Sequence, residues 1–197
     1  VMAMFSLLPF LFCCMTSFLR YVIVFAMLKT AMGTQSVPPA MVIIGLSMIL
    51  TFYTMGPTFQ KMYDMGSVPY QKNQNIVEAI NEGSKPLKEF MLKQTRESDI
   101  EFFIQMSKGT APKNPEELTV WQVAPAYIVS EFKTAFEIGF IIFVPFIVLD
   151  LVVANILLAL GMFMLSPTII SLPFKLLIFI AVDGWALIVQ GLVTSYN

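Results

Sequence analysis

Residues 125–185 decide the fold, and they read PAYIVSEFKTAFEIGFIIFVPFIVLDLVVANILLALGMFMLSPTIISLPFKLLIFIAVDGW. Inside this stretch, two long apolar segments flank a short break at Ser166-Pro167. The first segment, Ile138–Leu165, has 28 residues and would be ~42 Å long as an α-helix, longer than a hydrocarbon core of ~30 Å. The second segment is Leu172–Val193. The pattern predicts a helical hairpin whose tip lies at the break.

Three charged residues interrupt the apolar segments of this hairpin: Asp150, Lys175 and Asp183. A charge at the centre of a bilayer costs about 2.5–3.5 kcal/mol on insertion scales, so we expect other helices, backbone groups or water to satisfy all three. Lys175 and Asp183 are eight residues apart, which would place them on one helix face without direct contact. Proton transfer through Asp150 or Asp183 is the alternative, but such relays usually contain several acids or a histidine.

The composition of the whole chain excludes most soluble functions. The 197 residues are 57% hydrophobic and only 13% charged, with a net charge of −1 and no histidine. An ordinary soluble domain is about half apolar and a quarter charged, so a membrane-associated protein is expected. The charge balance gives no indication of nucleic-acid binding. The sequence contains no motif for a phosphate loop, a nucleophile or a metal site, so we expect no enzyme activity, cofactor or metal.

An apolar hairpin is also predicted at the start of the chain, over residues 1–60. Residues 1–32 are almost continuously apolar, and Pro9 is expected to kink them. The opening run resembles the core of a signal peptide but lacks a basic region before it, so we interpret it as a helix of the mature protein. The segment Gly33–Pro39 predicts a turn, and Ala40–Phe59 predicts a second helix that ends at Gly56-Pro57.

Two features of this first hairpin allow more than one interpretation. Arg20 lies well inside the apolar run, where it either snorkels toward the interface or pairs with an acid in the assembly. Cys13 and Cys14 are adjacent, and we interpret them as small buried or lipid-facing residues. A metal site built on these two cysteines would need further ligands that the chain lacks.

Residues 61–124 predict a polar, mostly helical insertion between the two hairpins. Residues 61–117 contain 17 of the 25 charges of the chain. Ser84 is a suitable N-cap and Pro86 fits the first turn, so a helix is expected to begin there. Several prolines and glycines are expected to divide the insertion: Pro69, Gly83, Pro86, Gly109, Pro112 and Pro115. The predicted fold is therefore all-α, with domains 1–60, 61–124 and 125–197.

The tip of the second hairpin, Gly161–Pro167, is rich in flexible apolar side chains. The chain has 14 methionines, and two of them, Met162 and Met164, flank Phe163 here. Methionine usually fills gaps in a core, which is one interpretation of the tip. In the other interpretation, several copies meet around an axis, and their deformable side chains close a hole against ions yet part for a passing chain.

Several long motifs in this chain resemble one family. They are FLRYVIVFAMLKTAMGTQSVPPAMVIIGL (18–46), KPLKEFMLKQTRESDIEFF (85–103), PAYIVSEFKTAFEIGF (125–140), VPFIVLDLVVANILLALGM (144–162) and ISLPFKLLIFIAVDGW (170–185). In this order they are similar to the FliP/SctR family of type III secretion export-gate proteins. The run KPLKEFMLKQTRE and the following APKNPEELT favour the flagellar branch. SPTIISLPFKL and the closing GLVTSY are also similar to the virulence-system proteins.

The resemblance implies an assembly. Family members form a pentamer-like ring that joins FliQ-like and FliR-like subunits, and the complex is a gated conduit for unfolded substrate proteins. FlhB-like and FlhA-like export proteins and membrane lipid are further implied partners. The implied location is the bacterial inner membrane, at the flagellar basal body and partly on the periplasmic side. Flagellum biosynthesis would then require the chain.

The resemblance also implies roles for individual residues. The methionine-rich loop of the family forms a gasket in the pore, and here it corresponds to Met162, Phe163 and Met164, with Phe163 where the family often has another methionine. That change makes the loop stiffer and bulkier but leaves it apolar. Polar contacts between subunits are implied for three residues, Arg96, Glu131 and Lys175.

Three interpretations of function therefore remain open. A conduit predicts that Met162 and Met164 line a constriction made by several copies. A polytopic transporter or channel for small ions predicts that Asp150 and Asp183 converge on a site in one copy. A scaffold predicts that no residue contacts a lumen. The conduit is the leading prediction, in a flagellar or else a virulence export system.

Overall fold

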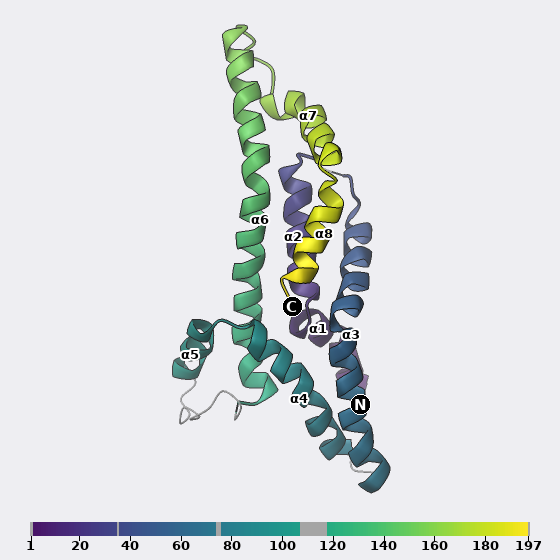
Figure 1. Ribbon diagram of the computed structural model, residues 1–197. Helices are drawn as coiled ribbons and strands as arrows, with labels where there is room; N and C mark the ends of the chain where they lie inside the picture. Colours follow the sequence, from purple (N-terminus) through teal and green to yellow (C-terminus); the bar gives the residue numbers. More distant parts are fainter. Residues whose placement is uncertain (1, 35, 74–75, 107–117, 197) are drawn as a thin grey trace. The chain divides into compact units, whose positions relative to one another are not determined.

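The computed structural model describes residues 2–34, 36–73, 76–106 and 118–196 (Figure 1). Within these ranges the chain forms eight α-helices and no strand, which confirms the all-α fold class. In chain order the helices are α1 (Met2–Met15), α2 (Phe18–Ala31), α3 (Ala40–Asn73), α4 (Ile76–Gln94), α5 (Glu97–Met106), α6 (Val120–Ala159), α7 (Pro167–Ala181) and α8 (Gly184–Thr194).

Two helices continue where the sequence predicts a break or a start. Helix α3 passes through Pro57 and Pro69, so the predicted end at Gly56-Pro57 is wrong. Helix α4 begins at Ile76 and passes through Pro86, so the predicted start at Ser84 is wrong as well. Proline removes one N–H donor, but ending the apolar helix α3 at Pro57 would leave many more backbone groups unsatisfied. Three predicted breaks lie outside the described residues: Gly109, Pro112 and Pro115. The same holds for residues 111–117, which form most of the APKNPEELT run.

Two predicted helices are instead divided by sharp bends. A bend of 76° separates Pro9–Met15 from α2. Pro9 lies inside α1, and the break comes at Thr16, whose hydroxyl donates to the Phe12 carbonyl (2.7 Å) and accepts from the Phe18 N–H (3.4 Å). Thr16 thus caps the start of α2, since its side chain replaces backbone partners at a helix end.

The second bend, of 63°, separates α7 from α8. Asp183 lies at this bend in the left-handed region, with φ 51° and ψ 50°. Aspartate tolerates this conformation better than most residues. Gly184 follows, and a Cβ atom there would collide with the ring of Phe179. The prediction of one helix over Leu172–Val193 is therefore wrong, and Lys175 and Asp183 do not share a helix.

The first compact unit comprises Val1–Arg20 and Met48–Thr134. Its buried core contains Met15, Met91, Leu118, Val123, Ala124 and Tyr127. Helix α4 supplies Met91 to this core and is amphipathic, as surface helices commonly are. The unit boundaries fall inside α2, α3 and α6, because they follow contacts. The predicted division at residues 60 and 124 follows composition and stays a prediction.

Helices α3 and α4 approach closely at a pair of glycines in this unit. A Cβ atom on Gly66 would lie 3.1 Å from the Ala79 carbonyl oxygen, and one on Gly83 would lie 3.1 Å from the Met62 carbonyl oxygen. We expect Gly66→Ala or Gly83→Ala to lower the free energy of unfolding by about 1–3 kcal/mol, because backbone atoms cannot move aside as a flexible side chain can. Unfolding in mixed micelles, followed by circular dichroism, measures the change.

Gly56 is the matched control for these substitutions. It also lies inside α3, but a Cβ atom there would have no neighbour within 4 Å. Gly56→Ala should therefore stabilise the helix by up to ~1 kcal/mol, because alanine has the higher helix propensity. Equal effects at Gly56 and Gly66 would contradict the close approach of α3 and α4.

The second compact unit comprises Tyr21–Ser47 and Ala135–Asn197. Aromatic side chains fill its core. The ring centroids of Phe179 and Trp185 are 5.5 Å apart, those of Phe146 and Phe179 are 6.4 Å apart, and those of Phe25 and Trp185 are 6.4 Å apart. Such offset and edge-on pairs stabilise a core beyond the area that they bury. They hold the bent pair α7–α8 against α2 and α6 within this unit.

Long apolar faces remain uncovered by the chain itself. Two helices are long and apolar enough to cross a membrane, and each bent pair would count as one further span. In α3, only 22% of the most apolar stretch of 18 residues is buried within the chain. In α6, the corresponding share is 17%. Apolar surface of this extent needs lipid or other protein around it. These helices fit a membrane protein.

Candidate functional site

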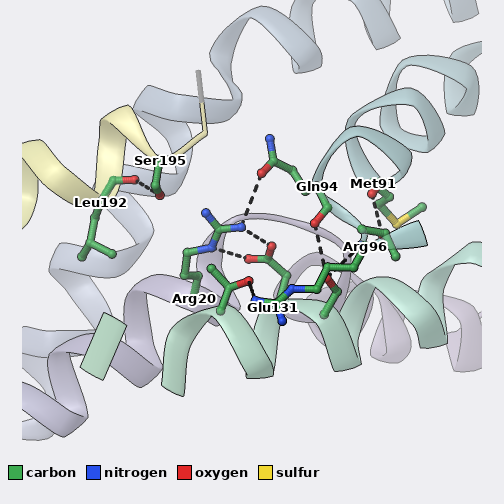
Figure 2. A network of polar contacts seen from close by, with 10 residues as sticks. Arg20, Met91, Gln94, Arg96, Glu131, Leu192 and Ser195 are labelled. Carbon is green, nitrogen blue, oxygen red and sulfur yellow. Dashed lines mark hydrogen bonds and ion pairs between the residues drawn. The ribbon is translucent and has the colours of Figure 1, made fainter. Parts of the chain in front are cut away.

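A buried ion pair joins α2 to α6 inside the first unit. Nε of Arg20 donates to Oε2 of Glu131 at 2.9 Å, and Nη2 of Arg20 donates to Oε1 (Figure 2). The two side chains are 3% and 0% exposed. This two-pronged arrangement matches the planar guanidinium to the carboxylate and is the strongest form of such a pair. Of the two interpretations of Arg20, the structure supports pairing with an acid, and that acid, Glu131, belongs to the chain itself.

Further polar groups of the first unit surround this pair. Nη2 of Arg20 also donates to Oε1 of Gln94 at 3.4 Å. The Ser130 hydroxyl donates to the Gln94 carbonyl oxygen and accepts from the Arg96 N–H at 3.1 Å. Nη2 of Arg96 donates to the Thr134 hydroxyl at 3.4 Å. Figure 2 shows that these bonds link the end of α4 to α6 beside the ion pair. The network satisfies groups that would otherwise be costly to bury.

A second ion pair in this unit joins α5 to α6. The ammonium of Lys133 donates to Oδ1 of Asp99, whose side chain is 5% exposed, while the side chain of Lys133 is 48% exposed. Sequence reasoning did not pair these residues. The signal was weak, because Asp99 lies among many charges of the insertion and nothing in its local pattern marks it as buried.

A third ion pair lies within the second unit and joins α6 to α7. The ammonium of Lys175 donates to Oδ2 of Asp150 at 2.7 Å and to the Ala31 carbonyl oxygen at 3.3 Å. The Ser171 hydroxyl donates to Oδ1 of Asp150. Asp150 and Lys175 are thus satisfied by other helices and backbone, as predicted. Each lies eight or nine residues from its end of the tip loop, about 12–14 Å along a helix.

The tip loop between α6 and α7 exposes its apolar side chains. Met162, Phe163 and Met164 are 48%, 76% and 99% exposed. The turn ends α6 in a regular way: the Gly161 N–H donates to the Leu158 carbonyl and the Met162 N–H to the Leu157 carbonyl. This Schellman arrangement requires a left-handed residue, and Gly161 supplies it with φ 73°. The structure therefore presents the predicted gasket residues outward on a well-formed turn.

The other predicted site residues stand as follows. Asp183 is exposed on the surface of the chain, and Asp150 is 30% exposed, so their burial in an assembly stays a prediction. Contacts between subunits through Arg96, Glu131 and Lys175 also stay predictions, because each of these side chains has a partner within the chain. Arg20 was not predicted as a site residue, although an arginine inside an apolar run is a signal that an acid is nearby.

The charged groups of these three ion pairs join helices to one another. Among the described residues, no group of three or more histidine, cysteine, aspartate or glutamate side chains could hold a metal ion. The buried charges occur as pairs that fix one helix against another, and the exposed groups of the tip are apolar. Such an arrangement can hold a hairpin in place and offer its tip as a contact surface.

Comparison with known proteins shows the relationships of the chain. The family model described as FliP family matches residues 1–192. The flagellar biosynthetic protein FliP of Buchnera aphidicola subsp. Acyrthosiphon pisum is 48% identical over 193 residues, covering 98% of this chain and 51% of the relative. The FliP of Pectobacterium carotovorum is 44% identical over 192 residues, covering 97% and 74%. That of Bacillus subtilis is 43% identical over 197 residues, covering 100% and 89%.

The matches extend over nearly the whole chain, although the chain spans only about half the length of the Buchnera relative. The matched range contains the tip loop and the long apolar helices of this chain. On the family match over residues 1–192 and identities of 43–48%, the chain belongs to the FliP family.

Proposed function

We propose that this chain is a subunit of the flagellar protein export gate. Several copies, together with FliQ-like and FliR-like subunits, would enclose a gated conduit for unfolded substrate proteins. The role is structural and not enzymatic. The observation that carries the proposal is the tip of the α6–α7 hairpin, where Met162, Phe163 and Met164 are exposed on a regular turn.

The physical argument rests on what an exposed apolar tip can do. A single chain gains nothing by exposing a phenylalanine and two methionines, because burial of such side chains stabilises by about 1.5–3 kcal/mol each. Copies of the tip that meet around an axis would bury these side chains against one another. Methionine has a flexible, unbranched side chain, so the closed ring would part for a passing polypeptide and close again.

The partly buried ion pair Asp150–Lys175 supports the same proposal. It joins the two arms of the hairpin, and Lys175 also binds the Ala31 carbonyl. The tip is thereby held at a defined position relative to α2 within the second unit. A gasket needs such a rigid support, because deformable side chains close a pore only where the backbone places them at its axis.

The uncovered helices support partners and a membrane location. Most of the apolar surface of α3 and α6 is uncovered within the chain. We propose that other copies, FliQ-like and FliR-like subunits and membrane lipid cover it, with FlhA-like and FlhB-like proteins as further partners. The location proposed is the bacterial inner membrane at the flagellar basal body, partly on the periplasmic side.

Met162→Ala and Met164→Ala are expected to let ions leak through the resting complex while export continues. The smaller side chains would leave the closed ring incompletely filled, since a truncated apolar residue leaves a cavity of its own volume. Ion conductance of the complex in planar bilayers, after co-expression with FliQ-like and FliR-like subunits, measures the leak. Swimming of a strain that lacks its own FliP-family protein measures export.

Met41→Ala is the matched control for the tip variants. Met41 is 80% exposed on α3, so the same chemical change is made on an exposed methionine away from the tip. The control should show no added conductance. Tip variants that stay sealed and support normal swimming would overturn the gasket assignment.

A transporter of small ions is the other candidate, and the structure gives it little support. That function needs Asp150 and Asp183 at one site. Instead, Asp150 binds Lys175 and Ser171, and Asp183 lies eight residues beyond Lys175, about 12 Å along the chain axis. A virulence export system is less well supported than a flagellar one, because the relatives found are named as flagellar proteins.

A further inference from the structure

Two opposite charges of the second unit are left without an ion pair. Five charged side chains belong to this unit: Lys29, Glu137, Asp150, Lys175 and Asp183. Asp150 and Lys175 pair with each other, and Glu137 has an interaction partner within the chain. In the part of the chain that the structure describes, Lys29 and Asp183 therefore remain without a counter-charge.

The carboxylate of Asp183 is not used to cap a helix. Asp183 stands at the N-cap of α8, where an aspartate commonly accepts a hydrogen bond from the second or third N–H of the helix. Its side chain makes no such bond, and the residue is exposed. An acid in an apolar segment usually pairs with another group of the protein or faces water. This carboxylate is thus free to bind a cation from outside the chain.

Two contacts between α2 and the α7–α8 pair place both charges at the same level of the unit. The ammonium of Lys175 binds the Ala31 carbonyl oxygen at 3.3 Å, and the ring centroids of Phe25 and Trp185 are 6.4 Å apart (Figure 1). Along the chain, the unpaired aspartate lies between Lys175 and Trp185, and the unpaired lysine lies between Phe25 and Ala31. Since the stretch from Phe25 to Ala31 is about 9 Å long as a helix, both charges lie in one layer of about that thickness.

We propose that Asp183 of one copy of this chain pairs with Lys29 of a neighbouring copy. The two charges are opposite, lie at the same level and interrupt apolar helices, where an unpaired charge is costly. A contact between two different surface positions is heterologous, and its repetition around an axis closes a ring. The inference rests on the part of the proposed function in which several copies assemble.

Lys29 has two other possible roles, and both would be confined to its own copy. It lies in the last turn of α2, where the helix dipole favours a cation. A lysine near a helix end can also extend toward lipid headgroups. In either role, no change at Asp183 of another copy could compensate for a change at Lys29.

An exchange of charges between copies tests the pair. Two variants of the full chain, Lys29→Glu and Asp183→Lys, are each produced with two different affinity tags, together with FliQ-like and FliR-like subunits. We expect copies of either variant to co-purify with one another about tenfold less than unchanged copies do, because like charges or unmatched charges would meet. A mixture of the two variants should recover most of the co-purification. In the mixture, the introduced glutamate meets the introduced lysine, and the unchanged Lys29 meets the unchanged Asp183.

Two kinds of control accompany the mixture. Lys93→Glu makes the same change at an exposed lysine of α4, so it should assemble normally and should not rescue Asp183→Lys. Lys29→Gln and Asp183→Asn remove a charge without reversing it, and asparagine tolerates the left-handed backbone at position 183. Each of these two should lower co-purification by only about threefold. Circular dichroism checks that every variant keeps its helices.

Three outcomes would overturn the inference. Poor assembly of both charge variants without rescue in the mixture would show that each charge acts within its own copy or on lipid. Normal assembly of both variants would show that neither charge lies at a contact between copies. These two outcomes leave the proposed function intact. Failure of unchanged copies to co-purify at all would contradict the proposed function together with the inference.

Discussion

Glu131→Ala is expected to lower the free energy of unfolding by about 3–5 kcal/mol, because it leaves the Arg20 guanidinium buried without its counter-charge. The Arg20 and Glu131 side chains are 3% and 0% exposed, so water cannot replace the lost carboxylate. Arg20→Ala should cost a similar amount, since it leaves the Glu131 carboxylate equally buried. Unfolding of the purified chain with increasing mole fraction of dodecyl sulfate in mixed micelles, followed by circular dichroism, measures both changes.

Two controls separate the buried charge from the loss of a side chain as such. The double variant Arg20→Met/Glu131→Leu should recover most of the lost stability, because apolar residues of similar size often replace a buried ion pair at little cost. Glu82→Ala removes the acid of an exposed pair and should change stability by less than ~1 kcal/mol. A double variant that is as unstable as Glu131→Ala would contradict this account.

The same pair has a consequence for assembly. The resemblance to the FliP/SctR family implies contacts between subunits at Glu131, and in this chain the carboxylate already binds Arg20. If the pair acts only inside the chain, the double variant should restore co-purification with FliQ-like and FliR-like subunits together with stability. If Glu131 also contacts a neighbour, stability should return and co-purification should not.

The helical fold could be predicted because its signal is local. Apolar runs such as Ile138–Leu165 have the length and composition of long helices. The bends and boundaries could not be predicted in the same way. Pro57 and Pro86 do not end their helices, whereas Thr16 and Asp183, which carry weaker local signals, mark the actual breaks. Tertiary packing, such as Gly184 against Phe179, decides these cases.

The polar site could be predicted only in part. That Asp150 and Lys175 need partners follows from the cost of a charge in apolar surroundings, and the structure pairs them with each other. That Arg20 pairs with Glu131 could not be predicted, because 111 residues separate them and several acids were available. Exposure of the tip follows from its turn geometry. Closure of a pore by several tips depends on other copies, and one sequence contains no direct signal for their arrangement.

Substitutions of Asp150 and Lys175 are expected to have unequal effects. Asp150→Leu leaves the Lys175 ammonium, whose side chain is 3% exposed, without its counter-charge and with the Ala31 carbonyl as its remaining partner among the described residues. It should cost about 3–5 kcal/mol. Lys175→Met leaves the Asp150 carboxylate, which is 30% exposed and keeps the Ser171 hydroxyl. Partial access to water and this hydrogen bond should limit the cost to about 1–3 kcal/mol. Unfolding in mixed micelles measures both.

The unequal loss of stability distinguishes Asp150–Lys175 from Arg20–Glu131. Both partners are buried in Arg20–Glu131, whereas only Lys175 is buried in Asp150–Lys175. The double variant Asp150→Leu/Lys175→Met should recover stability but not the fixed position of the tip. The double variant lacks the hydrogen bonds of Lys175 to Asp150 and to the Ala31 carbonyl. Apolar packing between the substituted residues is non-directional, so it would not fix α7 at one position. We therefore expect this variant to fold, to assemble and to leak ions as the Met162 and Met164 variants do. A stable double variant that stays sealed would show that packing alone positions the tip.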